Sequence, residues 1–270
     1  MNEAFYLFRY AFLQRALVSG LFIAIACSLL GVFLVLRRQS MMGDGLAHFA
    51  FGAIGLALLL GRAPLGVTLV LTALASLLIF ALPDRTGPYA DAAIGMISAV
   101  GVASGVLMAS LGGGFTVDLF SYLFGDLLAV GRTEARLAVL LTCLILGTVL
   151  PARRELLAIT YDETAARVAG IHPARWRRVL AVLTALAVVL GIRVVGTLLV
   201  SSLLIFPAVT ALQWRRSFHG VLFLAPCIGV LSVASGLVLA VLLNWPAGAL
   251  IVLLNALGLA LTLLWRALRR

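Results

Sequence analysis

Long apolar runs separated by short polar breaks dominate the chain from end to end. A helix needs about 20 mainly apolar residues to cross the hydrocarbon core of a bilayer. The pattern therefore predicts an all-α, polytopic membrane protein with about nine transmembrane helices, with eight as the alternative count. The alternative arises at Arg193, where a turn either separates the sixth and seventh spans or breaks one helix. The expected spans are residues 16–36, 43–60, 65–82, 92–111, 134–150, 179–191, 196–214, 220–243 and 247–265.

One stretch between the fourth and fifth spans departs from this pattern. It opens with a triple glycine and continues as FTVDLFSYLFGDLLAVG, which carries Asp118 and Asp126 among aromatic residues. Such a segment is long enough to enter the membrane but too polar to cross it comfortably, so we predict a re-entrant or interfacial helix near residues 115–130. The whole chain, residues 1–270, is expected to form a single transmembrane domain.

The fourth span contains a small-residue motif. Gly101 and Gly105 have the GxxxG spacing that lets two membrane helices approach closely. The motif predicts a close helix contact here, although such glycine pairs also arise by chance.

Composition agrees with a membrane protein and limits the chemistry. Hydrophobic residues make up 63% of the chain and charged residues only 11%. All twenty basic residues are arginines, and the net charge is +10. Because a P-loop needs a lysine against the nucleotide phosphates, any use of ATP must come from a partner. The arginines lie at the ends of apolar runs, which favours anionic lipid over nucleic acid as their partner.

The distribution of the arginines predicts an orientation. With nine spans, fourteen of the twenty arginines fall on one side of the membrane and six on the other. The arginine-rich side is expected to be cytoplasmic, because positively charged short loops are retained there. This places the N-terminus outside and the C-terminus in the cytoplasm.

Asp44 and His48 form the most unusual pair in the sequence, at the start of the second span. On a helix this spacing puts a carboxylate and an imidazole on one face. Both groups are good ligands for zinc, manganese and iron, and two ligands suit a pathway that must release its ion. The alternative, equally weighted from the residues alone, is that Asp44 caps the helix and His48 bonds to a neighbour.

Residues 152–178 form the one substantial hydrophilic segment. Within it, ITYDETAARVAGIHP predicts one short helix, with Thr160 and Glu163 as a capping box and Gly170 at its end. Its apolar positions are Ala165, Val168 and Ala169. This face indicates either a docking surface for a cytoplasmic partner or a solvated loop helix, and the residues alone do not decide between them.

Other chemistry has little support. The three cysteines, Cys27, Cys143 and Cys227, lie in apolar runs without CxxC spacing, so we interpret them as small buried side chains. HExxH and GxSxG motifs are absent from the sequence, which argues against a metalloprotease or a serine hydrolase.

Four blocks of the sequence together resemble a known family. They are LGVFLVLRRQSMMGDGLAHFAFGAIGLALLLG, SYLFGDLLAV, ITYDETAARVAGI and VGTLLVSSLLIFPAVTA, in that order. The chain resembles the ABC-3 permeases, the membrane subunits of ABC-type zinc, manganese and iron importers, over about residues 12–265. The resemblance implies a divalent metal ion as substrate, with no cofactor bound in this chain.

The resemblance also implies partners, a location and site residues. The partners are a second copy of the chain, two copies of an ABC ATPase subunit and an extracytoplasmic metal-binding receptor, in the inner membrane of a prokaryote. Asp44 and His48 fall on the metal-pathway positions of the family. The ATPase coupling helix of the family falls on Thr160, Tyr161, Asp162, Glu163, Ala165, Val168, Ala169 and Gly170. Gly45 departs from the family pattern and is expected to loosen the start of the second span.

Two other classes of protein compete with this interpretation. A secondary transporter driven by an ion gradient would work without an ATPase and would have more acidic residues within its spans. An intramembrane enzyme would place a nucleophile beside a base, and the sequence shows no such pair. An ATP-driven importer is therefore the leading hypothesis.

Overall fold

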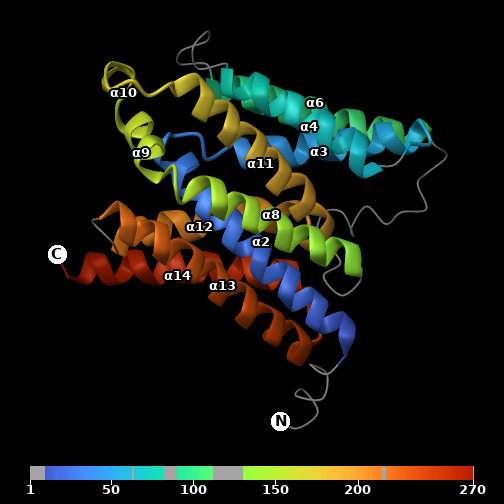
Figure 1. Ribbon diagram of the computed structural model, residues 1–270. Helices are drawn as coiled ribbons and strands as arrows, with labels where there is room; N and C mark the ends of the chain where they lie inside the picture. The colour runs from blue at the N-terminus through green and yellow to red at the C-terminus, as the bar shows by residue number, and fades with distance from the viewer. Residues whose placement is uncertain (1–9, 63, 82–89, 112–129, 215–216, 270) are drawn as a thin grey trace.

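The structure, a computed structural model, describes residues 10–62, 64–81, 90–111, 130–214 and 217–269. Within these ranges the chain is folded entirely into helices joined by short turns (Figure 1). They are α2 (Ala11–Leu36), α3 (Met42–Leu59), α4 (Pro64–Ala81), α6 (Ala90–Leu111), α8 (Arg132–Val149), α9 (Arg153–Tyr161), α10 (Glu163–Val168), α11 (Pro173–Val195), α12 (Thr197–Trp214), α13 (Phe218–Leu243) and α14 (Ala247–Leu268). The predicted all-α membrane fold is confirmed.

Seven or eight membrane crossings fit the lengths and composition of the described helices. In the part of the chain that the structure describes, seven helices are long and apolar enough to cross a membrane: α2, α3, α6, α11, α12, α13 and α14. Helix α8 reaches that standard only together with α9, to which it is joined at a bend of 69°, and the pair raises the count to eight. Helix α4 is a shorter apolar helix. The count of nine is therefore not confirmed, and the helix expected near residues 115–130 lies outside the described residues.

Helix α2 lies in the middle of the bundle. Every residue from Ile23 to Leu34 except Ile25 is buried, as expected for a helix that is apolar on all sides. It packs against α8, α11, α12 and α13. Helices α3, α4 and α6 form one group at the top of Figure 1, and α12, α13 and α14 form another below it. Helix α11 contacts both groups and joins them through α3, α4 and α12.

Glycines hold α3 and α6 together, which confirms the close approach predicted from the GxxxG spacing. A Cβ atom added to Gly101 would lie 2.7 Å from the carbonyl oxygen of His48 in α3. One turn further along α6, Gly105 faces Gly55, where an added Cβ would lie 3.4 Å from the Gly105 Cα. Gly52 meets Gly101 in the same way. Small residues on both helices therefore bring the two backbones into contact.

Replacing Gly101 with valine should destabilise this contact by about 1–3 kcal/mol, because the new side chain meets backbone atoms that cannot rotate away. Thermal unfolding of the purified protein in detergent would measure the loss. Gly95→Val is the matched control, since nothing lies within 4 Å of a Cβ at that position on the same helix. Equal unfolding temperatures for the two variants would show that the glycine contact does not stabilise the fold.

Near Arg193 the chain forms two helices, α11 and α12, joined at a single glycine. The chain ends α11 at Val195, passes through Gly196 with φ of 87°, and begins α12 at Thr197. Glycine is the residue that adopts this conformation without a Cβ clash. All three residues are buried within the bundle, which keeps the backbone groups at the break away from lipid. Two helices, each apolar enough to cross a membrane, therefore meet here.

Two helix starts differ from the predicted spans by more than two residues. Helix α11 begins at Pro173, not near residue 179, because proline is well suited to the first position of a helix. The end of the predicted hydrophilic segment is thus the arginine-rich first part of a long helix. Helix α2 begins at Ala11, before the predicted start at residue 16.

Candidate functional site

Asp44 and His48 lie on one face of the first turns of α3. Asp44 is in the first turn of the helix, and its Oδ2 atom is 3.6 Å from Nε2 of His48. The Asp44 side chain is 35% exposed and the His48 side chain 26% exposed. The spacing in sequence therefore brings the two groups together, at a place that an ion from outside the chain can reach.

Ser201 of α12 completes this cluster, and its contribution was missed by the sequence analysis. Its hydroxyl lies 3.2 Å from Oδ1 of Asp44 and 3.3 Å from the carbonyl oxygen of Thr197, and it can donate to either. Ser201 also lines a groove of about 420 Å³ between α12 and α14, so the cluster is next to open space. A serine far from Asp44 along the chain has no sequence signal that would pair it with this carboxylate.

Two glycines explain how α12 comes close enough for Ser201 to reach Asp44. A Cβ at Gly31 of α2 would collide with the carbonyl oxygen of Leu204, and a Cβ at Gly43 of α3 would collide with the side chain of Leu204. The absence of side chains at both positions allows α12 to pack against α2 and α3 at once. Ser201 lies one helical turn from Leu204 on the same helix.

The geometry of the pair suits a weakly held metal ion. Two ligand atoms that each lie about 2.1 Å from one tetrahedral ion are about 3.4 Å apart, close to the spacing of Asp44 and His48. Among the described residues there is no group of three or more His, Cys, Asp and Glu side chains that could hold a metal. Asp44 and His48 can therefore supply two ligands, with Ser201 as a neutral oxygen nearby and other positions open.

The capping alternative for Asp44 is not what the structure shows. Met41 is the N-cap residue of α3, and it makes no side-chain capping bond. Asp44 lies inside the helix, where its charge still interacts favourably with the positive end of the helix dipole. Gly45 also differs from expectation: it is within α3, and a Cβ there would lie 2.6 Å from Cγ2 of Ile94 in α6. The absence of a side chain at Gly45 therefore allows α3 to pack tightly against α6.

The hydrophilic segment forms two short helices, not the single helix predicted. Asp162 separates them and is the N-cap of α10, accepting hydrogen bonds from the backbone N–H groups of Thr164 and Ala165. The predicted capping box at Thr160 and Glu163 is therefore wrong, because the Thr160 hydroxyl donates to the Leu156 carbonyl within α9. Asp162 has the extended backbone conformation of an N-cap residue, and aspartate is among the preferred residues at that position.

The predicted apolar face of this segment is fully accessible. Val168 is 87% exposed and Tyr161 is 75% exposed, and Ala165 and Ala169 are also exposed. Gly170, with φ of 80°, ends α10 as predicted, and the N–H of Ile171 donates to the carbonyl of Ala166. The arrangement presents a short apolar surface on a helix with both ends fixed.

Glu163 anchors α10 to the rest of the bundle. Its carboxylate pairs with Arg37 at the end of α2 at 2.8 Å, and with Arg177 of α11 at 3.8 Å. Arg37 also lies 3.5 Å from the carbonyl oxygen of Ile159 in α9. The Arg37 and Arg177 side chains are about nine-tenths buried, whereas Glu163 is 29% exposed. Arg37 and Glu163 lie 126 residues apart, so no sequence pattern predicts their contact.

The cysteines are all free thiols in the structure. Cys27 is buried in α2 as predicted, but Cys143 is exposed and Cys227 is partly exposed. An apolar run does not distinguish a side chain in the core from one on the outer face of the bundle.

Comparisons with known proteins agree with this fold. The ABC 3 transport family matches residues 9–266. The high-affinity zinc uptake system membrane protein ZnuB of Haemophilus influenzae is 32% identical over 93% of this chain and 96% of its own length. The manganese import system permease protein ScaB of Streptococcus parasanguinis is 31% identical over 92% of this chain and 88% of its own.

A solved structure agrees as well. A chain of PsaBC from Streptococcus pneumoniae, solved in complex with Fab, superposes with a TM-score of 0.86 at 28% identity and covers 97% of this chain and 94% of its own length. The family match and the structural similarity both extend over nearly the full length of this chain. The chain belongs to the ABC 3 transport family.

Proposed function

We propose that this chain is the permease of an ABC importer for divalent transition metal ions, and that Asp44 and His48 hold the ion transiently during transport. The observation that carries the proposal is a carboxylate and an imidazole 3.6 Å apart and partly exposed in an otherwise apolar bundle. Such a pair is costly to place inside a membrane, so its presence there indicates a functional site. The chain is a membrane subunit without catalytic activity, and a separate ATPase hydrolyses ATP.

The chemistry of the pair supports zinc, manganese or iron as substrate. Imidazole and carboxylate together accept all three, and selectivity can rest with a receptor that delivers the ion. The names of the relatives ZnuB and ScaB refer to zinc and manganese, respectively. A site with two ionisable ligands and open positions suits release to the other side of the membrane better than storage.

The proposal includes an orientation and partners. The end of the bundle that carries α9, α10 and the C-terminus, on the left of Figure 1, faces the cytoplasm, and α2 begins at the outer side. In this orientation α4 and α8 cross the membrane with the seven longer helices. A second copy of the chain completes the pathway, two ATPase subunits dock on α10, and a receptor delivers metal from outside.

Replacing Val168 with aspartate should break the ATPase contact, because it puts a charge in the centre of the exposed apolar face of α10. The amount of ATPase that purifies with the permease is expected to fall about tenfold, and metal uptake by cells expressing the complete transporter should fall with it. The fold should be unchanged, since Val168 is 87% exposed and has few internal contacts to lose.

Val168→Ile keeps the apolar face and is the matched control. Uptake that continues in Val168→Asp cells after loss of the ATPase would indicate a transporter driven by an ion gradient. ATPase binding that is equal in the two variants would place the docking surface elsewhere.

A further inference from the structure

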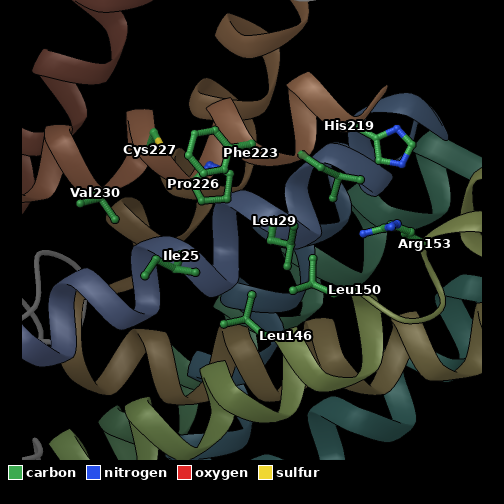
Figure 2. A pocket seen from close by; sticks show the side chains of 11 residues that line it. Ile25, Leu29, Leu146, Leu150, Arg153, His219, Phe223, Pro226, Cys227 and Val230 are labelled. Carbon is green, nitrogen blue, oxygen red and sulfur yellow. The ribbon is translucent and has the colours of Figure 1, made fainter. Parts of the chain in front are cut away.

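An apolar groove of about 490 Å³ runs along the outside of the bundle between α2, α8 and α13 (Figure 2). Its walls are aliphatic or aromatic over most of its length, including Ile25 of α2, Leu146 of α8 and Phe223 of α13. Phe223 is 75% exposed and therefore lies at the open side of the groove. The groove is separate from Asp44, His48 and Ser201, none of which lines it.

The groove is polar at one end only. Arg153, the first residue of α9, and His219, in the first turn of α13, lie together at that end, while Ile25 and Val230 lie at the other (Figure 2). Arg153 forms no ion pair within the part of the chain that the structure describes, and it is exposed. Arginine and an imidazole N–H both donate hydrogen bonds, so this end is suited to an anion with several acceptor oxygens.

The length of the groove matches one leaflet of a membrane. From His219 to Val230 the α13 backbone rises by about 16 Å, and half of the hydrocarbon core of a bilayer is about 15 Å thick. The polar end is level with the end of α8 and the start of α9, where the chain leaves the apolar region. In the orientation proposed above, the polar end is at headgroup level and the apolar end is near the middle of the bilayer.

We propose that this groove binds an anionic phospholipid, with one acyl chain along α13 and the phosphate against Arg153 and His219. A chain with net charge +10 and an exposed arginine at the rim of the groove attracts anionic over zwitterionic lipid. In the orientation proposed above, the lipid belongs to the cytoplasmic leaflet, and its headgroup lies beside the helix that leads to α10. The site itself does not depend on which metal is carried.

The test is lipid retention by the purified full-length permease after extraction from vesicles of equal phosphatidylglycerol and phosphatidylcholine. The wild-type protein is expected to retain phosphatidylglycerol over phosphatidylcholine by about fivefold, as measured by mass spectrometry of bound lipid. Arg153→Gln with His219→Gln should lose this preference, and Arg153→Lys should keep most of it. Arg154→Gln is the matched control, because Arg154 is an exposed neighbour that does not line the groove.

A second variant tests the acyl chain. Cys227→Trp narrows the apolar part of the groove and should lower retention of both lipids, with Arg153 and His219 in place. The proposal is overturned if retention in the Arg153 and His219 variant equals that of Arg154→Gln, or if inorganic phosphate displaces the lipid from the wild-type protein. A change from one oligomeric state to another in Cys227→Trp would overturn it too, by assigning the groove to a second copy. Metal binding at Asp44 and His48 is not needed for any of these results.

Discussion

Asp44→Ala and His48→Ala should each weaken the binding of Zn²⁺ or Mn²⁺ to the purified permease by at least about tenfold. Each substitution removes one of the two ionisable ligands, and loss of groups that merely support a ligand already costs about tenfold to a hundredfold in affinity. Uptake of metal by cells should fall in parallel at equal expression. Titration calorimetry would measure the affinity, and accumulation of each metal in a deletion strain would measure transport.

Ser201→Ala tests whether Ser201 is itself a metal ligand or only supports Asp44. Ser201 contacts Asp44 through one hydrogen bond at 3.2 Å, so its loss should have a smaller effect than loss of either ligand. His172→Gln is the control for histidine substitution, because His172 is exposed just before α11. Wild-type uptake in the Asp44→Ala and His48→Ala cells would show that the metal takes another path.

Apolar run length was enough to locate the helices, because it reports directly on the cost of placing polar groups in lipid. Run length could not tell which of these helices cross the membrane and which are too short or too polar to do so. Helix α8 carries Arg132, Glu134 and Arg136 in its first turns, so it is less apolar than a typical span. Helix ends were also displaced where proline at Pro173 and aspartate at Asp162 set the boundary.

The lateral neighbours of each helix could not be predicted. In a membrane, the side chains that face lipid are as apolar as those that face another helix, so the hydrophobic pattern does not mark the interface. The GxxxG motif at Gly101 and Gly105 is an exception, because only a close backbone contact requires small residues. The contacts of Asp44 with Ser201 and of Glu163 with Arg37 join distant parts of the chain and left no such signal.

These two contacts are connected through a short stretch of chain. Arg37 follows the last residue of α2, and the turn after it leads directly into α3 and Asp44. Arg38 in this turn has φ of 57°, and the N–H of Gln39 donates to the carbonyl of Leu34, so the turn is held against the end of α2. A displacement of α10 by a docked ATPase would therefore reach Arg37 and then the first turn of α3. With the ATPase docked on α10 as proposed, the contact of Glu163 with Arg37 would connect ATP hydrolysis to Asp44 and His48.

Glu163→Gln and Arg37→Gln should each lower the metal transported per ATP hydrolysed by several-fold, while the ATPase remains bound. Glu163→Gln leaves the mostly buried Arg37 without its carboxylate, and Arg37→Gln leaves Glu163 with only the longer 3.8 Å contact to Arg177. Either change frees α10 to move independently of α2. Reconstituted vesicles would give uptake and ATP hydrolysis together. Arg178→Gln is the matched control, because the Arg178 Nε atom donates to the Ala174 carbonyl of its own helix and Arg178 is exposed. An unchanged ratio in both Glu163→Gln and Arg37→Gln would show that the movement reaches Asp44 by a route other than the end of α2.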